Sequence, residues 1–418
     1  MREAGTSGTG TSGTGMDARR ALARVNLAAI ERNCARLRAE LEQGCQLCVV
    51  VKADGYGHGA AASAGAALAG GASRLAVAGA REAVDLRKAG FQDVPILVMG
   101  ALSPIELGEA VRAHAEVVVW REQDVHEVAA AGGAKVHVKL DSGMGRLGTR
   151  DPTQASRAVT AATSTAGVEL AGAMTHFATA DDLDDRFFDE QLDVFAAWAH
   201  EVKAAHPHIL VHAANSAAAL REKRAHFDMV RCGIAAYGMD PYGHDPDSAR
   251  LQPALELTSY LAEVKPCAAG QSAGYGRRFV AERDTMLGVL PIGYGDGWRR
   301  AFSDSAEVLV AGRRAPIVGT VSMDNLTVDL QGAADPLGLR GQEAVLIGTR
   351  GEQRVTAEEL ARNIGTINYE VTCALTARVP RVYHRDGQPT DESPWGSEPV
   401  SSREPGRAGE DSTPTSAR

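Results

Sequence analysis

Residues 48–59 read Cys-Val-Val-Val-Lys-Ala-Asp-Gly-Tyr-Gly-His-Gly, an apolar run that ends in a lysine and then in three spaced glycines. Val49–Val51 are β-branched and continuously apolar, as in a parallel strand covered on both faces. The glycines after Lys52 allow a tight turn and the close approach of a ligand. Two interpretations of Lys52 stay open at this point: a desolvated amine that forms a Schiff base, or a lysine whose charged end reaches solvent at the end of the strand.

The composition indicates a packed globular protein and excludes several classes of partner. The 418 residues allow two or three domains, with 44% hydrophobic and 23% charged residues. A net charge of −9 gives no basic footprint for nucleic acid, and no apolar run approaches the roughly 20 residues of a membrane helix. The six scattered cysteines lack metal-ligand spacing, and reduced thiols in a cytoplasmic protein are the simplest explanation.

Alternating strand and helix patterns fill the first part of the chain. Ala-rich amphipathic segments, such as 82–89, 104–113, 124–131 and 187–205, separate short apolar runs, and a helix over 27–41 precedes the first run. The runs predict eight strands, near 47–51, 75–78, 96–98, 117–119, 136–140, 170–174, 209–211 and 229–231. Eight strand-helix units predict a (β/α)₈ barrel. The alternative is a doubly wound open sheet, which the absence of G-x-G-x-x-G after the first strand disfavours.

The sequence pattern changes near residue 255, where runs typical of β-strands replace the predicted helices. They lie at 257–264, 285–292, 307–310, 315–330 and 343–347, with a last strand predicted near 371–382. One helix interrupts them, with Thr356 and Glu359 as a capping box and Gly365 at its end. We therefore predict a disordered leader (1–18), a barrel that binds the cofactor (19–254), a mainly β domain (255–386) and a disordered tail (387–418).

Polar residues gather where five of the barrel strands end, the edge at which barrel enzymes place their chemistry. These segments are Lys52, Lys139–Arg146, Thr175–Phe177, His212–Ser216 and Arg231–Ile234. The last two follow strands seven and eight, where backbone N–H groups commonly bind phosphate. A phosphate site and a reactive amine on one rim together suit pyridoxal phosphate, and no cluster of carboxylates or histidines indicates a metal.

Several motifs, in order, resemble those of alanine racemases between about residues 24 and 380. They are Val-Val-Lys-Ala-Asp-Gly-Tyr-Gly-His-Gly, Asp-Ser-Gly-Met-Gly-Arg-Leu-Gly, His-Phe-Ala, Asn-Ser, Arg-Cys-Gly-Ile-Ala-Ala-Tyr-Gly, Gly-Tyr-Gly-Arg, Ile-Gly-Tyr-Gly-Asp-Gly and Gly-Thr-Ile-Asn-Tyr-Glu. The resemblance implies a homodimer of two-domain subunits with shared active sites. It also implies interconversion of L- and D-alanine, which supplies D-alanine for peptidoglycan.

The resemblance also implies a role for each matching residue. Lys52 would carry pyridoxal 5′-phosphate as an aldimine, and Tyr275 of the other subunit would be the second base. The cofactor would contact Tyr56, His176, Asn215, Ser216, Arg231, Gly233, Ile234 and Tyr369, with Arg231 facing the pyridine nitrogen. Arg146, Met323, Asp324 and Tyr294 would line the substrate site, and Lys139 is the candidate for a carbamate. Ser322 departs from the pattern, because many members have cysteine there.

Racemisation requires an acid or base on each face of a planar intermediate, which explains why both a lysine and a tyrosine are needed. Three alternatives remain: a barrel-type pyridoxal-dependent decarboxylase, a racemase that prefers serine or a broader set of amino acids, and a non-catalytic cofactor-binding barrel. The β domain and Tyr275 disfavour the last of these. The decarboxylase is disfavoured because the second domain lacks a Gly-Gly-Gly loop.

Overall fold

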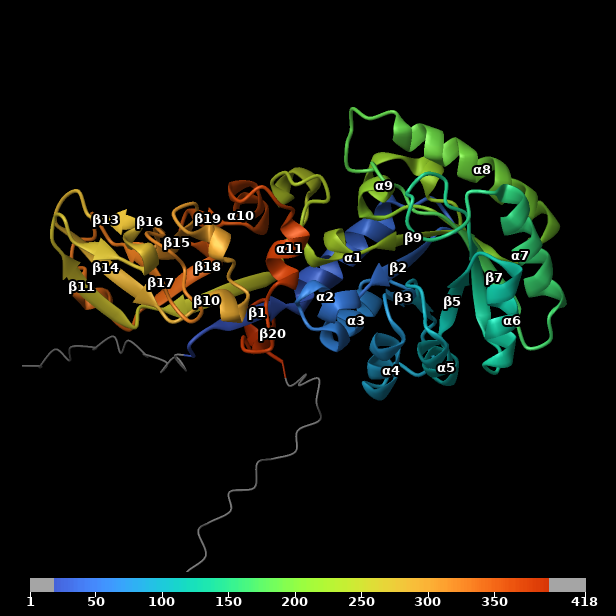
Figure 1. The fold of residues 1–418 in the computed structure, drawn as a ribbon, viewed down its shortest axis with the longest axis horizontal. Coiled ribbons are helices and arrows are strands. Elements are labelled where there is room, and N and C mark those ends of the chain that lie inside the picture. The colour runs from blue at the N-terminus through green and yellow to red at the C-terminus, as the bar shows by residue number, and fades with distance from the viewer. Residues whose placement is uncertain (1–18, 391–418) are drawn as a thin grey trace, which may run out of the picture.

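The structure is a computed structural model that describes residues 19–390, a barrel and a mainly β domain (Figure 1). The predicted leader, 1–18, and residues 391–418 of the predicted tail lie outside the described residues. Residues 387–390, which we assigned to the tail, are described. Gln388–Pro389 forms a short strand, β21, that pairs antiparallel with β20 (Arg381–Arg385).

Eight parallel strands close into the predicted barrel. They are β2 (Gln46–Val50), β3 (Arg74–Val77), β4 (Ile96–Val98), β5 (Glu116–Val119), β6 (Lys135–Lys139), β7 (Glu169–Met174), β8 (Leu210–His212) and β9 (Met229–Cys232). The first and last strands pair with each other, with Cys48 opposite Arg231. This pairing confirms the barrel and excludes the open doubly wound sheet.

Helices cover the outside of the barrel (Figure 1). They are α1 (Leu27–Glu40), α3 (Ala60–Ala69), α4 (Ala80–Lys88), α5 (Pro104–Arg112), α6 (Glu122–Ala130), α7 (Pro152–Ser164), α8 (Phe187–Ala205) and α9 (Ser216–Arg221). Several of them start with ordinary capping chemistry: Asn26 accepts a hydrogen bond from the N–H of Ala28, and Ser103 begins α5 in a capping box. Among residues 19–390, no helix is both long and apolar enough to cross a membrane.

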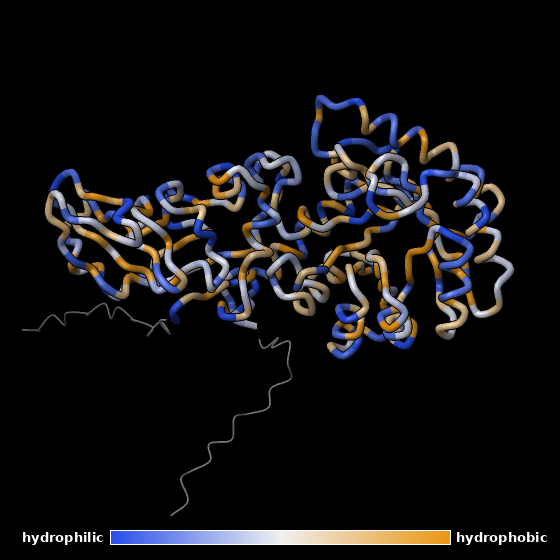
Figure 2. The backbone as a smooth tube through the Cα atoms, viewed as in Figure 1, coloured by the Kyte–Doolittle hydropathy of each residue, from blue (hydrophilic) through white to orange (hydrophobic). Residues whose placement is uncertain are grey.

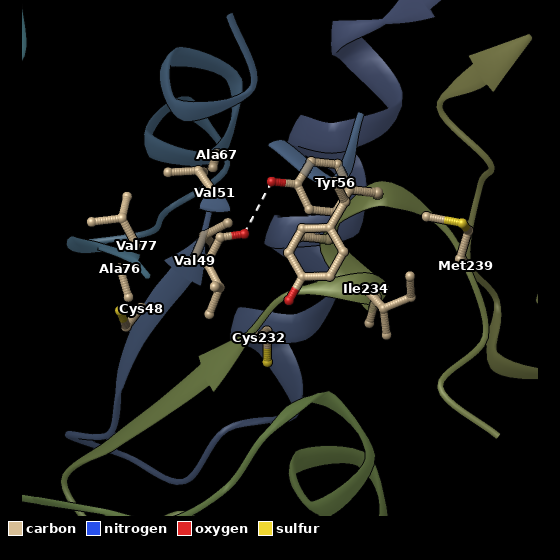
Figure 3. Packing of buried hydrophobic residues seen from close by; sticks show 14 of the residues in the cluster. Cys48, Val49, Val51, Tyr56, Ala67, Ala76, Val77, Cys232, Ile234 and Met239 are labelled. Atoms are coloured by element: carbon tan, nitrogen blue, oxygen red, sulfur yellow. Dashed lines mark hydrogen bonds between the residues drawn. The ribbon is translucent and has the colours of Figure 1, made fainter. Parts of the chain in front are cut away.

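Valine, alanine and cysteine side chains fill the barrel core beside β2, the strand that leads to Lys52. Figure 3 shows this packing, in which Val77 and Ala76 lie on one side of Val49 and Cys232 and Ile234 lie on the other. In Figure 2, the interior strands of both domains are mainly hydrophobic and the outer loops mainly hydrophilic. The apolar runs of the sequence therefore correspond to buried strands, which leaves the strand ends to carry polar groups.

The second domain contains the predicted β structure, divided among three sheets. The strands are β1 (Leu22–Asn26), β10 (Leu255–Tyr260), β11 (Glu263–Cys267), β12 (Ser272–Ala273), β13 (Phe279–Val280), β14 (Thr285–Leu290), β15 (Glu307–Val310), β16 (Arg313–Pro316), β17 (Leu326–Asp329), β18 (Glu343–Arg350) and β19 (Gln353–Val355), with β20 and β21. The largest sheet has the order β16-β15-β18-β10-β1-β20-β21, with β19 on β18. Strand β1, which we did not predict, lies between β10 and β20.

The predicted strand near 371–382 is wrong over most of its length, because residues 371–373 end a helix and only 381–382 lie in a strand. α10 (Ala357–Asn363) is followed by α11 (Asn368–Cys373), and strand β20 begins only at Arg381. The Asn368 side chain donates hydrogen bonds to the carbonyl oxygen of Asp240 and to Oε1 of Glu358, at 2.8 and 2.9 Å. These bonds fix the first turn of α11 and outweigh the β preference of Val371-Thr372.

Candidate active site

Lys52 lies at the end of β2, where the chain enters a left-handed turn. The segment α2 (Lys52–Tyr56) is not an ordinary helix, because Ala53, Asp54 and Tyr56 have φ angles of 52°, 52° and 54°. An L-residue in this conformation costs about 1–2 kcal/mol. Such strained residues persist only where the surroundings over-determine them, and they are frequent at functional sites.

The second domain holds this turn in place. A Cβ atom at Gly57 would lie 2.2 Å from the carbonyl oxygen of Thr372, and one at Gly59 would lie 2.0 Å from Oη of Tyr383. Both glycines have positive φ, 85° and 93°. Arg381 also donates a hydrogen bond from Nε to the carbonyl oxygen of Gly57 at 3.0 Å. The contact between the domains therefore explains why glycine stands at both positions.

The Lys52 amine is half-buried, and its pKa is lowered first by burial and then by the positive charge of Arg146. Glu82 and Cys373 oppose this shift. The Glu82 carboxylate also accepts a hydrogen bond from the N–H of Ala53 at 2.7 Å, which anchors the turn. A lowered pKa increases the fraction of free amine, the form that acts as a nucleophile or base.

Arg231, on β9, is buried and fixed by several acceptors. Its Nη1 donates to Nδ1 of His212 at 2.7 Å. Its Nη2 donates to the carbonyl oxygens of Thr175 and Ala213 at 2.8 and 2.9 Å, and lies 3.3 Å from Nδ1 of His176. His176 and Arg231, both predicted as cofactor-binding residues, are thus in contact with each other. Because no further hydrogen bond of this guanidinium is found within residues 19–390, its remaining N–H groups can face a ligand.

The hydroxyl groups of Ser216 and Tyr56 contact the backbone at Gly233, just after β9. Ser216 Oγ accepts hydrogen bonds from the N–H groups of Gly233 and Ala235, at 3.0 and 3.4 Å. A Cβ atom at Gly233 would lie 2.3 Å from Oη of Tyr56, so glycine is needed to admit the phenol. The Tyr56 and Tyr369 rings are 6.0 Å apart between centroids. The arrangement gathers hydroxyl and N–H groups as an anion-binding cradle requires.

Asn215 and Ile234, also predicted at this site, have structural contacts here. Asn215 Oδ1 accepts a hydrogen bond from the N–H of Ala218 at 2.9 Å, which caps α9. Ile234 is buried and begins a short 3₁₀ helix, Ile234–Tyr237. Both residues flank the cradle, and their side chains help to fix its backbone.

Lys139 ends β6 beside the loop that carries Arg146. Burial lowers the pKa of Lys139 to about 8, and the charges of Arg231 and Arg146 add to this effect. The loop is shaped by Asp141, whose Oδ1 accepts a hydrogen bond from the N–H of Gly145 at 3.0 Å. Arg146 itself is exposed at the mouth of the barrel.

Tyr275, predicted from the second domain as the second base, is not brought to Lys52 within one chain. Tyr275 begins a 3₁₀ turn between β12 and β13, at the end of the second domain that is farthest from the barrel (Figure 1). Its side chain is 74% exposed, and Tyr294 and Met323 are 42% and 52% exposed. Tyr294 and Met323 belong to adjoining loops, since the N–H of Gly295 donates to the carbonyl oxygen of Met323 at 2.9 Å.

An ion-pair cluster behind these loops was missed by the sequence reasoning. Buried Asp296 accepts a hydrogen bond from Nη1 of Arg20 at 2.6 Å and lies 3.3 Å from Nε of Arg378. Arg378 also binds Asp324 at 2.6 Å between Nη2 and Oδ1. Asp324 is thus held by a neighbouring guanidinium. The signal was present in Ile-Gly-Tyr-Gly-Asp-Gly, 292–297, where a charge stands among glycines.

A second polar set lies inside the barrel, and two of its residues, Glu116 and His137, were missed by the sequence reasoning. Glu116, His137 and His212 form a buried hydrogen-bonded series that ends at Arg231. The signal for Glu116 and His137 was a polar residue within each of two valine-rich runs, 116–119 and 135–139. Within residues 19–390, no group of three or more His, Cys, Asp or Glu side chains is arranged to hold a metal ion.

Two protein-family models match the chain, one for each domain. The model described as "Alanine racemase, N-terminal domain" matches residues 25–241, and that described as "Alanine racemase, C-terminal domain" matches residues 254–383. Among similar proteins, the alanine racemase of Geobacillus kaustophilus is 40% identical over 371 residues, which covers 87% of this chain and 94% of the relative. Alanine racemase 1 of Bacillus subtilis is 37% identical over 372 residues, covering 87% and 93%.

Solved structures give the same result. The chain resembles alanine racemase from E. faecalis with a TM-score of 0.81 and 36% identity, over 88% of this chain and 98% of the other. It also resembles alanine racemase from Bacillus anthracis with bound L-Ala-P, with a TM-score of 0.82 and 35% identity, over 89% and 97%. Both domains and nearly the full length of each relative are therefore matched.

Proposed function

Because this chain belongs to the alanine racemase family, we propose that it is an isomerase that interconverts L-alanine and D-alanine, with pyridoxal 5′-phosphate as its cofactor. The observation that carries the proposal is the Lys52 amine, whose pKa is lowered, on the same barrel rim as a buried guanidinium and a hydroxyl-lined cradle. The D-alanine would supply peptidoglycan synthesis. The six cysteine thiols are unpaired, which agrees with a cytoplasmic location.

The donor set fits the proposed cofactor. Lys52 supplies the amine that would bind its aldehyde carbon, and the cradle of Ser216, Gly233 and Tyr56 suits a phosphate. Tyr369, Asn215 and Ile234 would complete the phosphate site, and His176 would lie against the ring. When bound, pyridoxal phosphate withdraws electrons from the α-carbon of an amino acid and so makes its proton removable.

Two bases on opposite faces of the substrate would exchange the α-proton. Lys52 would remove or return the proton on one face, and its lowered pKa keeps part of the amine free for this task. Lys52 alone could return the proton only to the face from which it came. Tyr275 would act on the other face, where its 74% exposure leaves it free to reach a second subunit. Each such base typically contributes about 10²–10⁴-fold to the rate.

Arg231 would face the pyridine nitrogen of the cofactor. Guanidinium groups do not lose their proton in proteins, and Arg231 is fixed by His212, Thr175 and Ala213 while it keeps N–H groups without a partner among residues 19–390. A donor that keeps its proton would hold that nitrogen unprotonated. The electron withdrawal is then moderate, which would favour simple proton exchange over side reactions.

Substrate contacts would come from both subunits of a homodimer. Arg146, at the mouth of the barrel, would bind the substrate carboxylate, and Lys139 as a carbamate would hold this arginine in place. Met323, Asp324 and Tyr294 would come from the partner subunit. Their exposure, with Tyr294 and Met323 in adjoining loops, supports a surface that is completed by a second copy.

A chirality assay with a lysine variant tests the proposal. The protein with pyridoxal phosphate is incubated with L-alanine, and D-alanine is measured by chiral chromatography. We expect Lys52→Ala to lower the rate by at least about 100-fold, since it removes both the cofactor attachment and one base. The matched control is Lys88→Ala, a surface lysine with a 63% exposed side chain, which should keep the wild-type rate.

The assay also separates the alternatives. Carbon dioxide release without D-alanine would indicate a decarboxylase, which family membership disfavours. A faster rate with serine than with alanine would change the preferred substrate but not the chemistry. Full racemase activity of Lys52→Ala would refute the assignment of the lysine.

A further inference from the structure

A series of polar side chains runs through the interior of the barrel to Arg231. It begins with Arg74 and Glu116, the first residues of β3 and β5, continues through His137 within β6 and His212 at the end of β8, and reaches Arg231 on β9. Both histidines are fully buried. The proposed chemistry uses only the last member, so the other four residues need an explanation.

The series consists of short contacts between successive side chains. Arg74 Nη1 donates to Glu116 Oε2 at 2.6 Å, and Nε2 of His137 lies 2.9 Å from the same oxygen. Nδ1 of His137 lies 2.8 Å from Nε2 of His212. Arg231 Nη1 then donates to Nδ1 of His212 at 2.7 Å. Every ring nitrogen of the two histidines therefore has a partner.

The two ends of the series fix the position of every proton between them. Arg231 can only donate, so Nδ1 of His212 must accept and the proton of this ring lies on Nε2. That N–H makes Nδ1 of His137 an acceptor, so the proton of His137 also lies on Nε2. The ionised Glu116 carboxylate can only accept, and it receives this proton's hydrogen bond. One direction satisfies all contacts, whereas a proton on Nδ1 of either ring would set two donors against each other.

The surroundings of His212 support a neutral ring next to Arg231, and those of Glu116 support an ionised acceptor. Burial and the charge of Arg231 lower the pKa of His212 well below its ordinary value. The pKa of Glu116 is lowered to about 2 by His137 and Arg74, against the effect of burial. Gly172 on β7 makes room for the His137 ring, because a Cβ atom there would lie 2.2 Å from its Nδ1. The absence of a side chain at Gly172 thus leaves the space that the His137 ring occupies.

We propose that Glu116 and His137 are positioning residues, which hold His212 in its Nε2-protonated tautomer so that it presents a lone pair to Arg231. The guanidinium is thereby oriented from the interior of the barrel, and its free N–H groups are turned towards the ligand. The consequence for the reaction rests on the proposed function, because it assumes that Arg231 faces the cofactor. The tautomers themselves do not depend on that assumption.

Histidine tautomers can be observed directly by NMR in the full-length protein. Long-range ¹H–¹⁵N correlation spectra of ¹⁵N-histidine-labelled protein at pH 8, without added cofactor, distinguish Nε2–H from Nδ1–H rings. His137→Gln and His212→Gln assign the two signals. We expect both rings to be neutral and protonated on Nε2. An Nδ1–H signal, or an imidazolium, from either residue would overturn the proposal.

A matched pair of variants tests the role of the carboxylate. Arg74→Met keeps Glu116 and should keep both tautomers, whereas Arg74→Met/Glu116→Leu removes the acceptor without leaving the Arg74 charge unpaired. In the double variant the Nε2–H of His137 is buried without an acceptor and only the Arg231 end still favours it, so the double variant should show mixed tautomers. Glu116→Gln, which retains an acceptor oxygen, should keep the wild-type pattern. Unchanged tautomers in the double variant would contradict the proposal. If that variant does not fold, the wild-type and Glu116→Gln spectra still decide it.

The kinetic measurement separates this inference from the proposed function. Loss of outer partners of a bound group typically lowers activity about 10–100-fold. We therefore expect kcat of the double variant to fall by that factor relative to Arg74→Met, with a smaller change in KM. If the wild-type protein made no D-alanine, the proposed function would fail while the tautomers could still be as predicted. Equal kcat values for the two variants would show that the series does not act on Arg231 during catalysis.

Discussion

At the scale of single residues, two lysines of the barrel rim show how burial and neighbouring arginines act together. Lys52 and Lys139 both have lowered pKa values, and burial is the first cause in each case. Arg146 contributes to both, and Arg231 contributes to the shift of Lys139. A cationic rim therefore favours neutral amines, and it would also attract an anionic phosphate or carboxylate.

The pKa of about 8 at Lys139 predicts carbamate formation by carbon dioxide. Only a neutral amine attacks carbon dioxide, forming an N–C bond and releasing a proton. At pH 7 about a tenth of Lys139 is neutral, against about one in 3,000 for an unperturbed lysine. We expect a carbamate signal in ¹³C NMR spectra recorded with ¹³C-bicarbonate at pH 8. It should be lost below about pH 6, because protonation of the amine releases carbon dioxide.

Another lysine of the same strand provides the control for this measurement. Lys139→Ala should remove the signal, and Lys135→Ala should keep it, since Lys135 is exposed and paired with Glu169. A signal that persists in Lys139→Ala would assign the carbamate to another amine.

At the scale of elements, α10 and α11 connect the second domain to the cradle. Thr356 caps α10 by accepting a hydrogen bond from the N–H of Glu359 at 3.1 Å. Glu358 on the same helix accepts a hydrogen bond at 2.9 Å from Asn368, the first residue of α11. Tyr369 follows directly. The position of this phenol thus depends on α10, whose Glu358 also accepts a hydrogen bond at 3.1 Å from the N–H of Asp240, in the segment that follows β9.

We expect Thr356→Ala to lower the free energy of unfolding by about 1 kcal/mol, because it removes the N-cap of α10. The midpoint of urea unfolding measures this change. Thr356→Ser keeps the hydroxyl and should remain close to the wild-type midpoint. Equal losses in the alanine and serine variants would point to the methyl group of Thr356 and would contradict the capping explanation.

At the scale of the whole molecule, Tyr275 lies far from Lys52 within one chain. Whether it acts on the site of a second subunit can be tested by mixing two variants. Lys52→Ala and Tyr275→Phe should each be inactive in the chirality assay. In a mixed dimer, one site has both intact residues and the other has neither. Random reassortment of equal amounts makes half of the dimers mixed, so we expect about a quarter of the wild-type activity.

The mixture is compared with the two variants measured separately under the same unfolding and refolding treatment. If the mixture has no more activity than its components, Tyr275 does not act across subunits. A Tyr275→Phe protein with full activity would show instead that this tyrosine is not a base.

The barrel strands were predictable because valine-rich runs alternate with amphipathic helices, and β4 matches its predicted range. Strand β1 was missed although it alternates in burial, because its partners, β10 and β20, lie far along the chain. The α11 segment was misassigned because Asn368, not the local preference, decides its conformation. The left-handed turn at Ala53 also depends on contacts with the other domain, which no local pattern reveals.

The candidate site was predicted best where residues stand at strand ends. Lys52, Lys139 and Arg231 do so, and the structure places them on one rim. Glu116 and His137 lie at the beginning and middle of strands that otherwise read as apolar, so their convergence required the closed barrel. The catalytic roles of Lys52 and Tyr275 remain predictions until the variants are measured.

The placement of β1 between β10 and β20 has a consequence for biosynthesis. The ribosome releases Leu22–Asn26 first, yet this strand finds both neighbours only after the barrel and most of the second domain have been made. Until then the nascent chain carries an unpaired edge strand, which is prone to pair wrongly with other chains. An excised 254–383 fragment would lack a central strand of its sheet, whereas a circular permutant that joins the two ends of the chain would keep it.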